Sequence, residues 1–292
     1  MATTEISPPA GIDRSRLRRA LGAGFGHPLA AIGSTGCILV LLVAIIGPLF
    51  APYDPLSQKM LARFAEPSWA HWLGADEYGR DILSRLLYAS RASIVISLAS
   101  IIVSVVIGVA IGILSAYRGG WIDAVISELS NVLLSFPTVV VGVLVIVALG
   151  SGETNVVVAL ALSFIPRFVR LARAETLSIK QRAYVEAAQL AGTSDVAIMA
   201  RHITPNVIGT AIVSGALWTA TALRAEATLS FLGLGVQLPY PSWGNMISDG
   251  MPYIFSNPGI VFFPCLAIVI AVVSFNILGD ALRDYFDPHS NN

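Results

Sequence analysis

Residues that could do chemistry are few in this chain, and their spacing suits contact rather than catalysis. The four histidines are scattered and the two cysteines lie in apolar runs, so the sequence holds neither a metal-ligand set nor a Cys–His nucleophile pair. A phosphate-binding P-loop needs Gly-Lys followed by Ser or Thr, whereas the two lysines, Lys59 and Lys180, follow Gln58 and Ile179. The sequence therefore predicts no enzyme active site, no ATP site and no bound cofactor or metal in this chain.

Glu226 is the best candidate for a functional charge inside an apolar stretch, and Arg224 lies two residues before it. Ionisable groups inside a membrane are costly and usually functional, which raises the alternative of a secondary transporter driven by an ion gradient. We favour a structural role, in which Glu226 pairs with a neighbouring helix or a companion subunit. A proton relay would need more than one such carboxylate.

A polar, helix-prone stretch, YVEAAQLAGTSDVAIMARHITPN (residues 184–206), lies between strongly apolar blocks. Residues 182–191 favour a helix, and Gly192 follows where helices commonly end in a left-handed conformation. The next two residues, Thr and Ser, can cap a second helix that runs towards His202, and Pro205 marks the next boundary. The pattern predicts two short helices joined by a glycine hinge.

Two interpretations of this stretch remain open on physical grounds. It is either a surface helix lying in the lipid headgroup layer or a docking element for a partner protein. Its basic residues are few and its apolar residues are small, so membrane anchoring would be weak. Docking is therefore favoured, because alanines at positions 187, 188 and 191 let a partner approach the backbone closely.

The composition of the chain places these residues in a membrane protein. Hydrophobic residues make up 55% and charged residues 12%, whereas a soluble domain has about 25% charged residues. The mean hydropathy is +0.74. The formal charge is zero, so nothing indicates a nucleic-acid partner.

Apolar stretches long enough to cross a bilayer, which needs about 20 residues of helix, predict an all-α membrane protein. We predict six transmembrane helices, at residues 29–50, 92–116, 122–149, 156–174, 207–232 and 259–278. Arginines before the first span and in the loops around residues 118 and 170–201 place these loops and both termini in the cytoplasm.

This topology divides the chain into five parts. We expect a cytoplasmic tail (1–28), a first span (29–50), an extracytoplasmic segment (51–91), a five-helix core (92–282) and a cytoplasmic tail (283–292). The core would hold the cytoplasmic loop 180–205 and an outer loop 233–257, which is rich in Gly, Pro and aromatic residues.

The stretch Glu186-Ala187-Ala188, with Gly192 at a fixed offset, resembles the EAA loop of bacterial ABC importer permeases. Four other segments resemble the dipeptide, oligopeptide and nickel branch of that superfamily, most of all its C-type permease. They are HWLGADEYGRDILSRLLYASRASI, LSFPTVVVGVLVIVALG, LSFLGLGVQLPYPSWGNMISDG and FNILGDALRDYFDP. The resemblance covers nearly all of the chain beyond residue 29, in the expected order.

The resemblance implies a type I ABC importer permease of the bacterial plasma (inner) membrane. Its partners would be a homologous second permease, two ABC ATPase subunits that carry ATP and magnesium, an extracytoplasmic substrate-binding protein and membrane lipid. The EAA loop would form the coupling helix that docks on an ATPase. The residues expected to couple are Tyr184, Glu186, Ala187, Ala188, Gly192, His202 and Pro205.

Other positions receive narrower expectations. Phe136, Pro137 and Glu226 are candidates for the pathway or a subunit interface, and Pro137 would bend its span. Tyr240 and Trp243 are either interfacial anchors or contacts for the binding protein. Arg224 departs from the family pattern, which more usually has an apolar residue there.

The function expected from these observations is ATP-driven import of dipeptides or oligopeptides, with the pathway formed between two permeases. The alternatives are a permease of the same family for nickel or another small solute, an ion-driven secondary transporter, and a passive membrane anchor for a complex.

Overall fold

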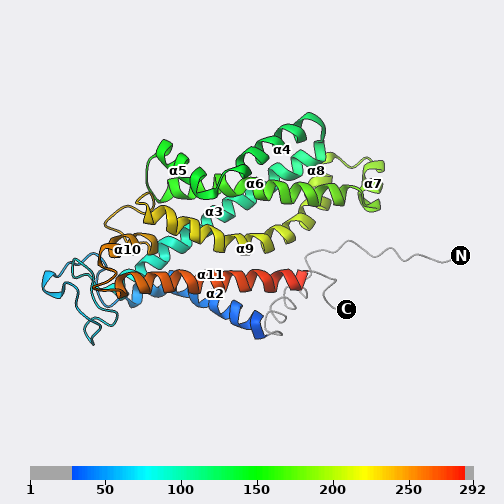
Figure 1. Ribbon diagram of the computed structural model, residues 1–292. Coiled ribbons are helices and arrows are strands. Elements are labelled where there is room, and N and C mark those ends of the chain that lie inside the picture. Colours follow the sequence, from blue (N-terminus) through cyan, green and yellow to red (C-terminus); the bar gives the residue numbers. More distant parts are fainter. Residues whose placement is uncertain (1–27, 287–292) are drawn as a thin grey trace.

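The computed structural model describes residues 28–286, and these residues form a bundle of long helices (Figure 1). Within this range the structure has no strand, only an isolated bridge between Ala75 and Asp81. The predicted all-α fold is confirmed. Expectations that rest on residues 1–27 and 287–292, including the basic N-terminal tail, lie outside the described residues.

Five helices carry the length of the bundle, and shorter helices connect them. The long helices are α2 (Pro28–Ile46), α3 (Ile82–Arg118), α6 (Glu153–Lys180), α9 (Thr204–Phe231) and α11 (Gly259–Phe286). The shorter ones are α4 (Gly120–Ser135), α5 (Thr138–Leu149), α7 (Ala183–Leu190), α8 (Asp195–Ile198) and α10 (Trp243–Gly250). Short 3-10 turns at Gly47–Phe50, Met60–Ala62 and Met251–Tyr253, and a π-helical turn at Met199–Ile203, complete the described helical elements.

Figure 1 gives the bundle two distinct ends. Helices α7 and α8 lie at one end, which we call the inner end, and α10 lies with residues 51–81 at the opposite, outer end. Helix α2 runs from the inner to the outer end, α3 returns to the inner end, and the bent pair α4–α5 leads back towards the outer end. Helix α6 then runs to the inner end, α9 to the outer end and α11 to the inner end. With α4–α5 taken as one crossing, this order agrees with the predicted order of crossings.

The described residues contain five helices long and apolar enough to cross a membrane, or six if the bent pair α4–α5 is one span. The predicted third span, 122–149, is therefore not one straight helix, because its two halves meet at 98°. Pro137 has no backbone N–H, and it pushes Phe136 into an extended conformation (φ −91°, ψ 140°). The bend predicted at Pro137 is present.

Two predicted boundaries are wrong. Helix α3 begins at Ile82 rather than residue 92, because Asp81 caps it by accepting a hydrogen bond from the Ser84 N–H. Pro205 does not end the second cytoplasmic helix, since residues 195–231 run on as a single helix. Proline is tolerated there because it lies in the first turn of α9, directly after the π-helical turn.

Close packing of α3 on α6 forms the centre of the bundle. Two glycines of α3, Gly108 and Gly112, lie against α6, where small residues allow close helix packing. A Cβ atom on Gly108 would lie 2.6 Å from the Phe168 Cβ atom and 2.8 Å from the Ile165 carbonyl oxygen, so only glycine fits. Phe164 and Phe168 of α6 are fully buried in the same core.

Candidate functional site

The inner end carries the stretch predicted to dock a partner, and its local structure follows the sequence closely. Helix α7 ends in a Schellman motif. The N–H of Gly192 donates to the Gln189 carbonyl (3.0 Å) and the N–H of Thr193 donates to the Ala188 carbonyl (3.1 Å). Gly192 has φ +79°, a left-handed conformation that disfavours other residues. Ser194 then caps α8 by accepting from the Ala197 N–H.

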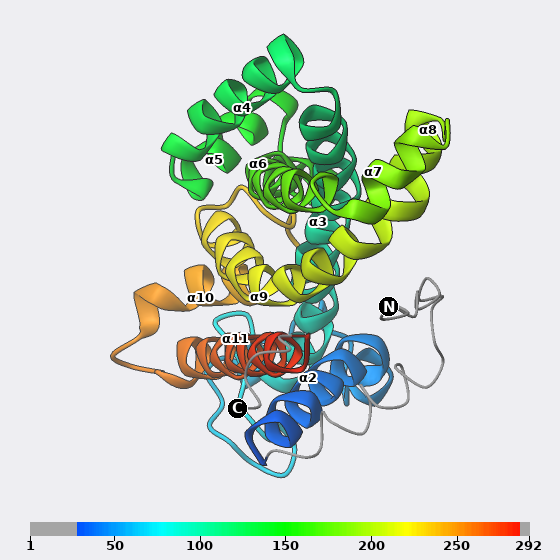
Figure 2. The same ribbon diagram turned by 90° about the vertical axis from the view of Figure 1, so that its right-hand side faces the viewer.

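Three apolar side chains hold this hairpin, formed by α7 and α8, against the long helices. Val185, Ile198 and Ile203 each have 0% exposure and belong to the core cluster that contains Phe168 of α6. Ala188 packs against the same cluster. The hairpin is therefore fastened to the core on one side and free on the other (Figure 2).

The free side of the hairpin has the character expected of a docking surface. Tyr184 is 44% exposed, Leu190 90% and Val196 68%, and Glu186 and Ala187 are exposed between them. We call these five residues the inner docking surface. His202 lies behind it, partly buried, with its ring centroid 6.2 Å from that of Tyr184. Pro205 is exposed at the start of α9.

Two hydrogen bonds that the sequence did not reveal join this hairpin to α3, and α3 to α6. The Tyr117 hydroxyl, near the end of α3, donates to Asp195 Oδ1 of α8 at 2.9 Å. Lys180 Nζ, the last residue of α6, donates to the Tyr117 carbonyl at 2.8 Å. No local sequence signal pairs these residues, because they are separated by 63 and 78 positions.

A second polar contact, an ion pair, joins α4 to α6 at the inner end. The Arg173 guanidinium binds Asp123 in a bidentate pair at 2.7 and 2.6 Å, and the Ser115 hydroxyl of α3 donates to the same carboxylate. Charge-assisted bidentate pairs are the stronger kind of hydrogen bond, and they fix orientation. These contacts hold α3, α4 and α6 together near the hairpin.

The bend between α4 and α5 exposes the residues predicted to line a pathway or an interface. Phe136 is 50% exposed, and Pro137 is exposed beside it. Arg167 of α6 reaches the bend and donates to Thr138 Oγ1 at 3.2 Å.

Glu226 lies inside the bundle rather than on its surface. Its side chain has 0% exposure, and its Oε1 atom accepts a hydrogen bond from the Ser230 hydroxyl at 2.7 Å. Arg224, two residues earlier, lies on the exposed side of α9. Among the described residues Glu226 forms no ion pair, and the hydrogen bond to Ser230 lies within α9, so the pairing with another helix or subunit expected from the sequence is not seen here.

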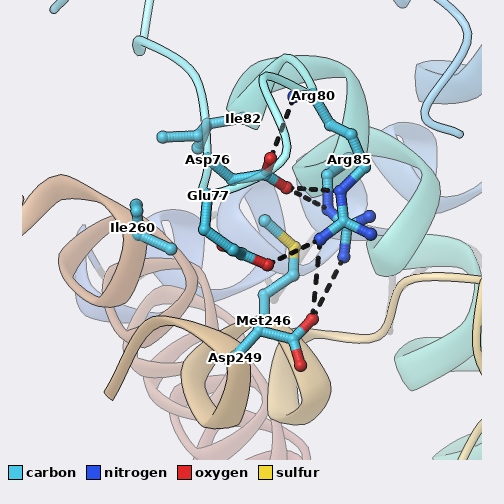
Figure 3. A pocket seen from close by; sticks show the side chains of 8 residues that line it. All are labelled: Asp76, Glu77, Arg80, Ile82, Arg85, Met246, Asp249 and Ile260. Atoms are coloured by element: carbon cyan, nitrogen blue, oxygen red, sulfur yellow. Dashed lines mark hydrogen bonds and ion pairs between the residues drawn. The ribbon is translucent and has the colours of Figure 1, made fainter. Parts of the chain in front are cut away.

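The outer end contains a buried charge cluster that the sequence analysis did not identify (Figure 3). Arg80 Nε donates to Asp76 Oδ2 at 2.6 Å, and Arg80 Nη2 donates to Glu77 Oε1 at 2.9 Å. Arg85, the largest side chain that is almost fully buried, lies 3.5 Å from Asp76 and 3.6 Å from Asp249 of α10. The cluster joins the segment before α3 to α10.

Burial raises the pKa of two carboxyl groups in this cluster. Desolvation, with a further contribution from neighbouring Asp76, raises the pKa of Glu77 above its ordinary value. Burial also raises the pKa of Asp249, although Arg85 and Arg80 oppose the rise. Loss of either arginine would leave buried carboxylates without compensation, which is strongly destabilising.

The two aromatic residues of the outer loop that were considered for partner contact differ in their exposure. Tyr240 is 61% exposed, whereas Trp243 is only 4% exposed. The Trp243 indole N–H donates to the Leu86 carbonyl of α3, and its backbone N–H donates to Ser93 Oγ. Trp243 therefore anchors α10 to α3 and is not accessible to a partner in this structure.

The described part of the chain contains no group of three or more His, Cys, Asp or Glu side chains that could hold a metal ion. The buried outer cluster consists of carboxylates already neutralised by arginines, so it does not offer free ligands.

Comparisons with known proteins agree with this architecture. A family model described as "Binding-protein-dependent transport system inner membrane component" matches residues 108–292. A second, described as "N-terminal TM domain of oligopeptide transport permease C", matches residues 15–67.

Individual relatives are similar over most of their length. The glutathione transport system permease protein GsiD of Pectobacterium atrosepticum is 40% identical over 258 residues, which cover 87% of this chain and 86% of that protein. The dipeptide transport system permease protein DppC of Alkalihalophilus pseudofirmus is 35% identical over 90% of this chain and 86% of that protein. GsiD of Escherichia coli O6:K15:H31 is 39% identical, over 86% of this chain and 83% of that protein.

Both the family match and the extent of these similarities exceed what a shared helical fold alone would produce. The chain belongs to the family of inner membrane components of binding-protein-dependent transport systems, and it is an ABC permease subunit of the C type, not an enzyme.

Proposed function

We propose that this permease imports small peptides, with dipeptides and glutathione as the two substrates to test first. The observation that carries this proposal is the 40% identity to a glutathione permease and the 35% identity to a dipeptide permease, each over most of the chain. Both of those names specify short peptides with free carboxylates. Nickel or another small solute is the weaker alternative, since neither name refers to a metal.

The ATPase subunits that supply the energy for transport would bind the permease at the inner docking surface. Its exposed residues, Tyr184, Glu186, Ala187, Leu190 and Val196, offer apolar and polar contacts to a cytoplasmic ATPase, while Val185 and Ile198 fasten the hairpin to the core. Glu186 would supply a polar contact, and Ala187 would allow close approach. Gly192 fixes the angle between α7 and α8.

Two ATPase subunits would bind ATP and magnesium. Hydrolysis of this ATP would move the hairpin. The Tyr117–Asp195 and Lys180–Tyr117 hydrogen bonds pass that movement to α3 and α6. Rigid-body rocking of the long helices against a homologous permease would then alternate access to the pathway. The bend at Pro137 and the exposed side of α9 would line that pathway.

The inner end would face the cytoplasm and the outer end the binding protein. The basic residues at the inner end, such as Arg118, Lys180 and Arg201, support this orientation through the positive-inside rule. Both termini would be cytoplasmic, in a bacterial inner membrane. Tyr240 and the segment 51–81 would then be available for the substrate-binding protein.

A transport assay with the complete importer tests the proposal. Proteoliposomes containing both permeases, the ATPases and the binding protein should accumulate radiolabelled dipeptide or glutathione only when ATP is enclosed with the ATPases. Uptake of a nickel chelate but of neither peptide would overturn the peptide assignment. Uptake by this chain alone under a proton or sodium gradient would instead support the secondary transporter.

A further inference from the structure

Arg224 is an exposed cation within α9, one of the helices long and apolar enough to cross a membrane. It lies seven residues before the end of α9 at Phe231, which corresponds to a depth of about 10 Å along a helix. Among residues 28–286 it forms no ion pair, and its one hydrogen bond is donated by Nη2 to Thr221 Oγ1 at 3.2 Å.

The direction of the side chain shows that Arg224 does not reach for the outer membrane surface. Arginines near a helix end usually extend towards the headgroups. Helix α9 runs from the inner to the outer end, and Thr221 lies one turn closer to the inner end. The guanidinium is therefore held over the interior of the span.

The surroundings of Arg224 differ from a lipid-facing surface. Thr221 and the exposed Thr228 flank it on the same stripe of α9, and Thr228 Oγ1 donates to the Arg224 carbonyl at 2.8 Å. The exposed side chains of α11 between residues 262 and 273, by contrast, are apolar: Phe262, Leu266, Val269, Ile270 and Val273. An arginine facing lipid near the centre of a span costs about 2.5–3.5 kcal/mol on insertion scales.

The local packing leaves the guanidinium free for a ligand. Only one of its five N–H donors is used by Thr221, and the nearest acidic residue in sequence, Glu226, is fully buried on another side of α9. Ala225 and Leu229, which neighbour Arg224 on α9, belong to one buried cluster with Ile146 of α5, so Arg224 lies on the part of α9 that packs against α5.

We propose that Arg224 is a carboxylate-binding site in the transport pathway and that it takes the carboxylate of the transported peptide. The proposal rests on the peptide-import function proposed above. A planar guanidinium pairs with a carboxylate through two parallel hydrogen bonds, and every peptide with a free C-terminus supplies one. The site favours anionic or zwitterionic peptides over neutral solutes of equal size.

Chemical rescue of a cysteine variant tests this site in the complete importer. Cys37 and Cys265 are first replaced by alanine, and Arg224→Cys is then introduced. Arg224→Cys should lower the maximal rate of dipeptide uptake about tenfold, as expected for loss of one charge-assisted interaction. Modification with an aminoethyl thiosulfonate, which restores a positive charge, should recover most of that rate. A sulfonatoethyl reagent of similar size should not.

The rate of thiol modification locates the residue. Saturating dipeptide with its binding protein should slow modification of Arg224→Cys at least about fivefold, because the peptide occupies the site. Arg91→Cys is the matched control, an exposed arginine on α3. Its modification should not depend on peptide, and its uptake rate should equal that of the cysteine-free protein.

Three results would overturn the proposal. They are equal rescue by both reagents, modification that does not depend on peptide, and complete protection of Arg224→Cys without peptide. The last would place Arg224 against the companion permease or a lipid phosphate. Arg224→Lys gives a separate check, since it should retain more uptake than Arg224→Gln. If the unmodified importer took up neither dipeptide nor glutathione, the peptide function itself would fail, whatever Arg224 does.

Discussion

Substitution of Gly192 should separate ATP hydrolysis from transport in a graded way. The residue has φ +79°, and nothing lies within 4 Å of where a Cβ atom would be. The cost of a side chain is therefore conformational and not steric. Alanine in this conformation costs about 1–2 kcal/mol, whereas asparagine adopts it more readily.

Proline at position 192 is a much larger perturbation. Its ring fixes φ near −65°, far from +79°, and it removes the N–H that donates to the Gln189 carbonyl. The lost hydrogen bond contributes about 0.5–1.5 kcal/mol and the backbone strain about 1–3 kcal/mol. A local cost of about 2–4 kcal/mol lowers the equilibrium constant for forming the native hairpin by at least about tenfold.

The assay compares uptake with ATP hydrolysis in proteoliposomes that contain the complete importer. The number of ATP molecules hydrolysed per peptide transported should rise in the order Gly192→Asn, Gly192→Ala, Gly192→Pro. Gly209→Ala is the matched control, because position 209 also has open space but lies in α9 without a positive φ. Normal coupling in Gly192→Pro would refute the role given to this turn.

The remaining predictions concern the docking surface, the core and the outer cluster. Glu186→Lys should change the thermal stability of the permease pair very little, since Glu186 is exposed, yet reduce co-purification of the ATPases. Gly108→Val should lower the free energy of unfolding by about 1–3 kcal/mol through overpacking against Phe168, seen in denaturant titration in detergent; an unchanged value would contradict the α3–α6 packing. Glu77 binds its proton more tightly in the folded protein than in the unfolded chain. The free energy of unfolding should therefore fall as pH rises through the raised pKa of Glu77. In thermal scans at several pH values, Glu77→Gln should make this fall smaller.

The long helices and the hairpin of α7 and α8 could be predicted from the sequence because their signals are local. Apolar runs of about 20 residues identified α2, α3, α6, α9 and α11. Gly192 indicated the end of α7, and the two cap candidates after it indicated the start of α8, where the structure has Ser194 as the cap.

The sequence predictions were wrong where tertiary contacts or neighbouring residues outweighed a local sequence signal. Pro205 suggested a boundary, but a π-helical turn before it allows the helix to continue. The start of α3 was placed ten residues late because the hydropathy of residues 82–91 is diluted by Arg85 and Arg91, although Asp81 and Ser84 form a cap. Arg85 is buried by acids from two segments, one of them α10.

The contacts between distant segments at the inner end could not have been predicted from one sequence. Tyr117 and Asp195 meet only because α3 ends beside α8, and Asp123 meets Arg173 only because α4 folds back on α6. The burial of Trp243 could not be predicted either, because an aromatic residue in a Gly- and Pro-rich loop suggests exposure. In the structure α10 places Trp243 against α3, where it is buried.

The central claim is that α7 receives force from a cytoplasmic ATPase, and cross-linking at Leu190 tests it most directly. Leu190 is 90% exposed on the inner docking surface and contributes little to the core. In a variant without other cysteines, Leu190→Cys should cross-link to an ATPase subunit and should be labelled by an impermeant thiol reagent only from the cytoplasmic side. Tyr240→Cys, at the outer end, should show the opposite sidedness. Labelling of Leu190→Cys in intact cells from outside, with no ATPase cross-link, would contradict the account.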